Sequence, residues 1–348
     1  MHFPSPFCSF GERGLGNFIT SNVNTAFLRK AISHLRLRFE IYSTTCPTPF
    51  IAPGLMVTRE IRNQSEIYLP IVEVTSAFNH LYRSALLYPP IYSSSPFHNA
   101  MSWADVFAAL PRRFQSSADP ACLLETLLAD RERLTDFLFA SFLPNRFYGG
   151  FQRYTAQQEF VRNWLAGRNV ETIRCLDAAC GTGEDTYGLL GLLMRQGFEP
   201  ENIHLEGWTL EPLEVWAATE RRFPHDPARE SLFREATSRV LAREYLDCIS
   251  FRCIDLIKEE TLSGVQFDLI ICNGLLGGPI ITSRQAIGIV VQHLVRQLAA
   301  DGILLAADHF HGGWKRHCPQ HELQAVFVLN GLSLIDAGEG IVGLKPYQ

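Results

Sequence analysis

The stretch at residues 173–187, IRCLDAACGTGEDTY, constrains the fold more than any other part of the chain. Residues 173–178 form a short apolar run that suits a buried strand, and the turn 180–183 (CGTG) follows it. Apolar residues at helical spacing begin directly after this turn. Glycines let the backbone approach a ligand closely, and the first turn of a helix offers unpaired N–H groups. The stretch therefore predicts a strand, a turn and a helix, and the turn either binds a ligand or merely joins the two elements.

Strands and helices alternate from residue 170 onward, which is typical of a parallel α/β sheet. The expected strands are 173–178, 203–209, 249–253, 267–272, 303–307, 333–336 and 341–344, and the expected helices include 212–222, 228–246 and 284–300. No helical pattern separates the last two strands, so we expect the chain to close with a hairpin that contains one antiparallel strand.

The preceding residues are less regular. Residues 1–100 are expected to be an N-terminal extension of unknown role, with a helix at 24–39 and a candidate strand at 67–74. Residues 101–168 are expected to form a helical domain and a linker, in which Asp119 caps a helix that continues through 122–142. Residues 169–348 then make the sheet domain.

The composition excludes several classes of protein. The net charge of −5 gives no general basic footprint for nucleic acid. No apolar run is long enough for a membrane span, and the N-terminus lacks the pattern of a secretory signal. The nine cysteines include no CxxC pair, which favours free thiols in a reducing cytoplasm over disulfides or a metal site. We therefore expect a cytoplasmic protein whose oligomeric state is open.

Four polar side chains follow the expected strands in order: Asp177, Glu211, Asp255 and Asn273. Ligands of open parallel sheets bind beyond the carboxyl ends of the strands. A carboxylate at Glu211 can accept both hydroxyls of a ribose, and Asp255 with the next backbone N–H can read an adenine edge. Each residue alone is explained by ordinary capping, but the ordered set behind a glycine turn predicts a nucleoside site.

The spacing Asp177-x-x-x-Gly181-x-Gly183 resembles the first motif of S-adenosylmethionine (SAM) methyltransferases. Residues 179–187 look like the (A/G)-C-S-T-G-E-E-P-Y segment of CheR-type chemotaxis methyltransferases, which methylate glutamate side chains of receptors. Residues 267–274 similarly resemble the FD-x-I-x-C-R-N stretch of that family. The resemblance covers roughly residues 140–345. It implies a Rossmann-like, seven-stranded class I methyltransferase sheet with a mainly helical N-terminal region.

The resemblance also implies the residues that contact SAM. Glu184 would contact the amino group of the cofactor, Glu211 the ribose, and Asn273 with Gly274 would replace the Arg-Asn pair of the family. The full implied set is Asp177, Ala179, Cys180, Gly181, Gly183, Glu184, Glu211, Pro212, Asp255, Leu256, Asn273 and Gly274.

The chain departs from the family at two places that concern the acceptor. The N-E-T-x-F-F-R segment has only a loose echo in residues 145–153, and the interval 223–246 reads as a charged helix where the family inserts a receptor-docking subdomain. A charge run of this kind is usually a solvated face. The acceptor is therefore left open between a protein carboxylate and a small molecule.

Four residues are candidates for contact with the acceptor. The adjacent glycines 149 and 150 suggest a hinge that closes over SAM with Arg146 or Arg153 facing the acceptor; alternatively, both arginines face solvent. His309 or His311 could serve as a general base for an alcohol or amine acceptor. The cluster His309, His311, His317 and His321 could also bind a metal or belong to an ordinary loop.

The sequence thus predicts a SAM-dependent methyltransferase. A non-catalytic SAM- or nucleoside-binding regulatory module is the alternative, and consumption of SAM would distinguish the two. An NAD-type oxidoreductase is disfavoured because Thr186 stands where GxGxxG has its third glycine.

Overall fold

The computed structural model describes residues 14–46, 51–54, 56–143, 151, 153–168, 170–238, 247–258, 264–278, 280–307 and 318–347. The chain divides into two compact units. The helical unit comprises the described residues of Gly11–Asn145 together with Phe223–Pro227, and the sheet unit comprises those of Arg146–Arg222 and Ala228–Gln348. The boundary expected at residue 100 lies within the helical unit, and that expected at residue 168 lies within the sheet unit.

The helical unit is built from α1 (Ala26–Thr45), α2 (Arg59–Tyr68), α3 (Ile71–Ala85), α4 (Trp103–Ala109), α5 (Pro120–Ala129) and α6 (Arg131–Phe142), with short 3-10 turns at Leu15–Asn17, Tyr92–Ser94 and Arg112–Phe114. The candidate strand at 67–74 is wrong, because these residues are the end of α2 and the start of α3, with Pro70 between them.

The helix expected through 122–142 is two helices rather than one. Asp119 caps α5 as predicted, because its Oδ1 accepts the N–H of Ala121 at 2.8 Å. Asp130 then starts α6, since its Oδ1 accepts from the N–H groups of Glu132 and Arg133 at 2.9 and 3.1 Å. A second capping aspartate inside an apolar run therefore divides it.

The core of the helical unit is aromatic. Phe78 is fully buried, with its ring centroid 6.0 Å from that of Trp103 and 5.7 Å from that of Phe137. The segment Phe223–Pro227 belongs to this unit: the ring of His225 is stacked on Phe139 at 6.1 Å.

In the described part of the sheet unit, seven strands lie in the order β3-β2-β1-β4-β5-β7-β6. Their bounds are β1 Ile173–Asp177, β2 Ile203–Thr209, β3 Ile249–Cys253, β4 Phe267–Ile271, β5 Leu298–Ala306, β6 Ser333–Ile335 and β7 Ile341–Leu344. Strand β7 runs antiparallel to β5 and β6, and the other pairings are parallel. The structure confirms the predicted α/β sheet and its terminal hairpin with one antiparallel strand.

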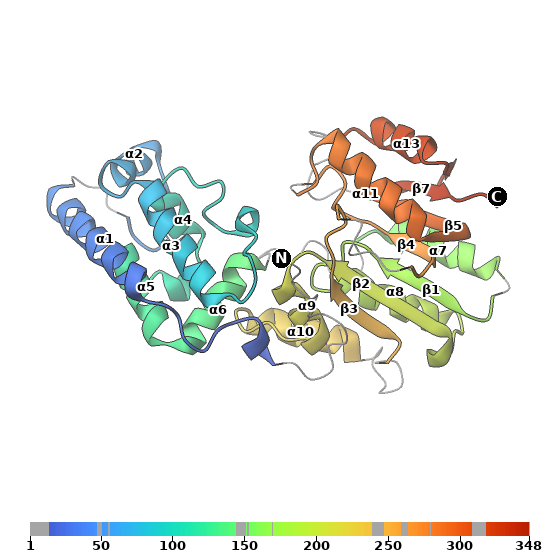
Figure 1. Ribbon diagram of the computed structural model, residues 1–348, viewed down its shortest axis with the longest axis horizontal. Coiled ribbons are helices and arrows are strands. Elements are labelled where there is room, and N and C mark those ends of the chain that lie inside the picture. Colours follow the sequence, from blue (N-terminus) through green and yellow to red (C-terminus); the bar gives the residue numbers. More distant parts are fainter. Residues whose placement is uncertain are drawn as a thin grey trace. The chain divides into compact units, whose positions relative to one another are not determined.

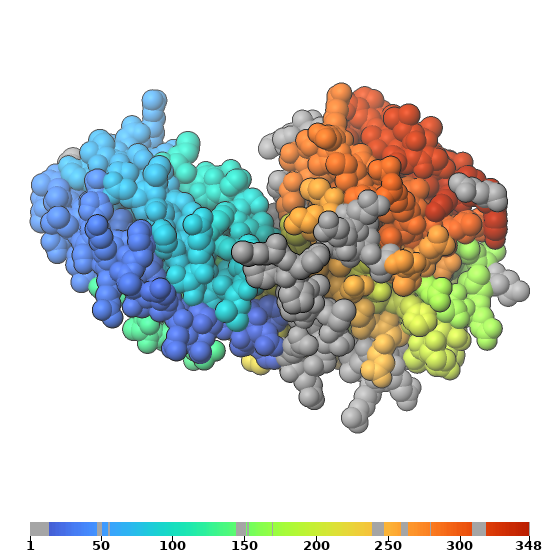
Figure 2. Space-filling model, in the orientation of Figure 1, coloured from blue at the N-terminus to red at the C-terminus, as the bar shows by residue number. Residues whose placement is uncertain are grey.

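Helices cover both faces of this sheet (Figure 1). On one face, α7 (Thr155–Ala166) and α8 (Glu184–Arg195) share a core with Cys175 of β1. On the other, α11 (Arg284–Gln297) and α13 (Gln320–Leu329) share a core with Leu176. Neighbouring residues of a strand point to opposite faces, so β1 joins the two cores. Side chains of α11 and α13, coloured orange to red, form the surface on their side of the unit (Figure 2).

The other described elements of the sheet unit are α9 (Pro212–Glu220), α10 (Pro227–Ser238) and the turn Pro200–Asn202. The expected helix at 284–300 ends at Gln297, and β5 begins directly after it. Asp301 within β5 has a φ of 58°, and its N–H donates to Lys345 O at 2.8 Å. Among the described residues, no helix is both long and apolar enough to cross a membrane.

Candidate active site

The glycine loop, residues 178–183, connects the end of β1 to the start of α8. Gly181 and Gly183 have φ values of +52° and +91°, which other residues rarely adopt. The two glycines differ in their surroundings. A Cβ on Gly183 would lie 3.0 Å from the Phe251 ring and 3.2 Å from Ala218 Cβ, whereas a Cβ on Gly181 would meet only Glu214 Oε1, at 4.0 Å. Gly183 is therefore required by internal packing, and the open side of the loop is at Gly181.

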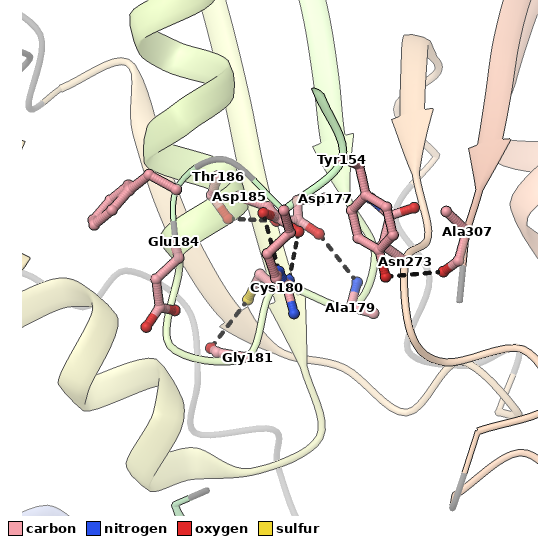
Figure 3. A network of polar contacts seen from close by, with 12 residues as sticks. Tyr154, Asp177, Ala179, Cys180, Gly181, Glu184, Asp185, Thr186, Asn273 and Ala307 are labelled. Carbon is pink, nitrogen blue, oxygen red and sulfur yellow. Dashed lines mark hydrogen bonds and ion pairs between the residues drawn. The ribbon is translucent and has the colours of Figure 1, made fainter. Parts of the chain in front are cut away.

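Asp177 stabilises this loop from beneath. Its side chain is buried; Oδ2 accepts from Thr186 Oγ1 at 2.7 Å and Oδ1 accepts from Ala179 N–H at 3.4 Å. Figure 3 shows Asp177 and Asp185 directed toward one another beside Thr186. Burial raises the pKa of Asp177, and the neighbouring Asp185 raises it further. Asp177 thus holds the turn in shape.

Arg153 is paired within this network. Its Nη2 lies 2.5 Å from Asp185 Oδ2, and the exposed fractions of the two side chains are 17% and 10%. Burial is the largest single effect on the pKa of Arg153 and lowers it, but Asp185, Tyr154 and Asp177 together outweigh burial, so the pKa is raised overall. Arg153 was expected to face an acceptor or solvent. In the structure its guanidinium forms an ion pair with Asp185 of α8. The end of the segment 145–153 is therefore attached to α8, the helix that follows the glycine loop.

Asn273, at the end of β4, is bound to α7. Its Nδ2 donates to Gln157 Oε1 at 2.8 Å, and Gln157 Nε2 donates to Asn273 Oδ1 at 3.1 Å. Tyr154 OH donates to Ala307 O at 3.4 Å at the end of β5. A cavity of about 20 Å³ lies between Tyr154, Gln157, Asn273 and Asp185, which is room for about one water molecule. The neighbouring Gly274, with φ +74°, donates its N–H to Ala307 O at 2.8 Å.

The end of β2 brings a carboxylate to the loop that the sequence reasoning missed. Glu211 caps α9, because its Oε1 accepts the N–H of Leu213 at 3.2 Å, and Pro212 opens the helix. Glu214, one turn later, accepts from Thr209 Oγ1 at 2.5 Å. Its Oε1 is the atom that faces Gly181. The signal in the sequence was a second acid in the first turn of the helix after β2.

Glu214 is electrostatically unusual. Burial raises its pKa to about 7, and the nearby Glu184 raises it as well, while Thr209 and Arg229 act in the opposite direction. A carboxyl group with such a pKa beside an open glycine turn is a candidate ligand-binding group.

Glu184, the first residue of α8, is paired with Arg229, a second residue that the sequence reasoning missed. Its Oε1 pairs with Arg229 Nη2 of α10 at 2.6 Å, and its Oε2 accepts from Thr182 Oγ1 at 2.6 Å. Arg229 Nη2 also donates to Thr182 Oγ1 at 2.6 Å. The charge run that contains Arg229 was expected to be a solvated face, but this side chain is only 10% exposed. Glu184, Glu214 and Arg229 therefore lie beside the glycine loop.

The expected adenine-reading residues lie at the end of β3. Asp255 Oδ1 accepts from Ile257 N–H at 3.1 Å, and Oδ2 pairs with Lys258 at 3.1 Å. Leu256 is buried in the core beside α11, and its carbonyl oxygen lies 2.9 Å from His293 Nδ1. Cys180 is buried in the loop, with its N–H donating to Trp208 O at 2.9 Å.

Several predicted residues fall outside the described part of the chain: Arg146, His309, His311, His317 and the glycines of the linker. His321 is exposed in the first turn of α13. Among the residues that the structure describes, no group of three or more His, Cys, Asp or Glu side chains could hold a metal.

Comparison with known proteins adds a likeness of fold. No family model and no curated protein sequence matches the chain. Among solved structures, the N-methyltransferase NodS from Bradyrhizobium japonicum, in complex with S-adenosyl-L-homocysteine, aligns with 63% of this chain and 100% of its own at 14% identity and a TM-score of 0.39.

Two further structures give similar values. A TehB-like SAM-dependent methyltransferase from Corynebacterium glutamicum aligns with 56% of this chain and 88% of its own, at 16% identity and a TM-score of 0.37. The sugar N-methyltransferase KedS8 from Streptoalloteichus sp. aligns with 55% and 87%, at 17% identity and a TM-score of 0.36. These similarities are too distant to support an argument about activity.

Proposed function

We propose that the chain is a SAM-dependent methyltransferase whose cofactor binds at the glycine loop. The observation that carries the proposal is the pair of carboxylates, Glu184 and Glu214, on the loop at the carboxyl edge of a parallel sheet. Phosphate-bearing cofactors favour helix N-termini without acidic side chains, because the phosphate binds the free N–H groups there. A carboxylate at the same place would repel the phosphate and compete for these groups. Two acids instead suit a cofactor that has hydroxyl groups and a positive charge but no phosphate.

SAM has these features: two ribose hydroxyls, an ammonium group and a sulfonium group whose methyl is activated for transfer. The residues present fit it. Glu214 would accept hydrogen bonds from hydroxyls at the open side of Gly181, and Glu184 would pair with a cationic group. Asp177 and Thr186 would keep the loop in its binding shape, so that little ordering is needed when the cofactor arrives.

The acceptor is proposed as a protein carboxylate or a small molecule. The likeness of residues 179–187 to the CheR-type segment supports a carboxylate. Arg153 adds no support for a carboxylate acceptor, because its guanidinium is paired with Asp185. A carboxylate acceptor is ionised at neutral pH and needs no general base, whereas an alcohol or amine needs one.

Binding and turnover test the proposal separately. Calorimetry with S-adenosylhomocysteine at about pH 8, above the pKa of about 7 of Glu214, should give binding to the wild type and a loss of about tenfold to a hundredfold for Glu214→Gln, because hydrogen bonds to a charged acceptor are worth about 1.5–3 kcal/mol. Glu220→Gln, at the exposed end of the same helix, is the matched control and should bind normally. Absence of binding to the wild type would refute the cofactor assignment.

Turnover is measured with methyl-labelled SAM and a cell lysate. Label in protein or in small molecules identifies the acceptor class. Binding without any consumption of SAM would favour the alternative, a regulatory SAM-binding module.

A further inference from the structure

A cation of the protein's own already sits on the glycine loop. Arg229 Nη2 lies 2.6 Å from Glu184 Oε1 and 2.6 Å from Thr182 Oγ1. The second oxygen of Glu184 accepts from Thr182 Oγ1. Both carboxylate oxygens are therefore engaged, and the charge of Glu184 is balanced by Arg229.

The position of Arg229 on its helix points to a role outside α10. It is the third residue of α10, which begins at Pro227. A cation in the first turn of a helix is disfavoured by the helix dipole, so Arg229 does not serve the helix that carries it. An acid in the first turn is favoured, as Glu184 is in α8. The ion pair of Arg229 and Glu184 therefore serves Glu184, because burying a carboxylate without a counter-charge costs free energy.

The rest of α10 is fixed independently of Arg229. Phe233, one turn further along, is fully buried, with its ring centroid 5.3 Å from Phe151 and 5.6 Å from Tyr187. The guanidinium can thus leave Glu184 without removing the helix from the unit, because the aromatic contacts remain.

We propose that Arg229 is a resident counter-ion that occupies Glu184 until the ammonium group of the cofactor replaces it. The inference rests on the proposed function, because it requires a cationic cofactor at this loop. The exchange is isoelectric at the carboxylate: one cation leaves as another arrives, and Glu184 is never left buried and unpaired. Cofactor binding then displaces the Arg229 side chain from Glu184 and Thr182.

The test compares two ligands that differ in the amino-acid part. S-Adenosylhomocysteine carries the ammonium group, and 5′-methylthioadenosine lacks the whole amino-acid chain. Calorimetry of Arg229→Gln should show tighter binding of S-adenosylhomocysteine, by about tenfold, because the competing cation is gone and Glu184 needs a partner. Binding of 5′-methylthioadenosine should stay within about twofold of the wild type, since it does not reach Glu184.

Two further variants separate this role from a structural one. Glu184→Gln should weaken S-adenosylhomocysteine and leave 5′-methylthioadenosine unchanged. Arg234→Gln removes an exposed arginine of the same helix, paired with Glu230 at 3.5 Å, and should leave both ligands unchanged. Far-ultraviolet circular dichroism of each variant reports whether it is folded, and Glu184→Gln carries the test if Arg229→Gln is not.

The outcomes distinguish the two proposals. If the wild type binds neither ligand, the proposed function fails, and this inference falls with it. If the wild type binds S-adenosylhomocysteine but Arg229→Gln weakens both ligands alike or leaves them unchanged, the counter-ion role is wrong while the cofactor assignment stands. If Arg229→Gln is unfolded, an unchanged affinity of Glu184→Gln for S-adenosylhomocysteine overturns the role as well.

Discussion

Glu214 gives the protein a dependence of stability on pH that one substitution should remove. Burial raises its pKa from the ordinary 4.5 to about 7. Between about pH 4.5 and pH 7, Glu214 is therefore protonated in the folded protein and ionised in the unfolded chain. The contribution of Glu214 to stability is full below pH 4.5 and is lost as the pH rises through 7.

The magnitude follows from the displacement of the pKa. At about 1.4 kcal/mol for each pH unit, the change amounts to about 3 kcal/mol in the free energy of unfolding. The side chain keeps some contact with solvent, which screens part of this, so we expect about 2 kcal/mol. Glutamine at 214 does not titrate and can still accept the hydrogen bond of Thr209. Glu214→Gln should accordingly be destabilising or neutral at low pH and stabilising at high pH.

The assay is urea unfolding of wild type and Glu214→Gln at about pH 5 and about pH 8, followed by circular dichroism. The buried carboxyls of Asp177 and Asp185 also have raised pKa values, but both remain in the variant, so the difference between the two proteins isolates Glu214. Glu220→Gln serves as the control and should follow the wild type. A stability difference that is the same at both pH values would refute the reasoning.

Other substitutions test the neighbouring contacts. Arg153→Ala should lower the free energy of unfolding by about 3–5 kcal/mol in urea titrations, because it leaves the buried Asp185 unpaired; a surface-like loss below 1 kcal/mol would contradict this. Gly183→Val should lower the melting temperature even without ligand, since Phe251 fills the space its Cβ needs. Glu211→Ala should cost about 1 kcal/mol of stability as a lost helix cap and weaken S-adenosylhomocysteine less than Glu214→Gln does in calorimetry.

The sheet could be predicted because its signals are local and repeated. Each parallel strand is a short apolar run, and the glycine turn marks where β1 ends and α8 begins. Prediction from the local sequence failed where an apolar run spans the junction of two helices. Residues 67–74 look like a strand, although Pro70 separates α2 from α3 there. It also missed the cap of α7, since Glu339 Oε2, which accepts from Ala156 N–H at 3.0 Å, lies 183 residues away along the chain.

The site was only partly predictable for the same reason. The glycine turn and Glu184 follow from the motif. Arg229 could not be found in advance, because nothing in a charged helical segment shows which of its arginines turns inward. Its partner Glu184 lies 45 residues away, and only the folded sheet brings them to 2.6 Å. Gly183 was predicted to contact SAM, and this stays a prediction; the structure adds that a Cβ at this position would meet Phe251 and Ala218.

The charges at the loop also bear on the third hypothesis, a dinucleotide-dependent oxidoreductase. A pyrophosphate needs the N–H groups at the start of the helix to be free of acidic side chains. Here the first residue of α8 is Glu184, which a cation must neutralise, and a second carboxylate, Glu214, faces Gly181. Bringing two further negative charges to this loop would raise the pKa of Glu214 still more and would compete for Arg229. The missing third glycine and the two acids beside the loop both disfavour a pyrophosphate at this site, and they agree with the proposal that a cationic nucleoside binds there.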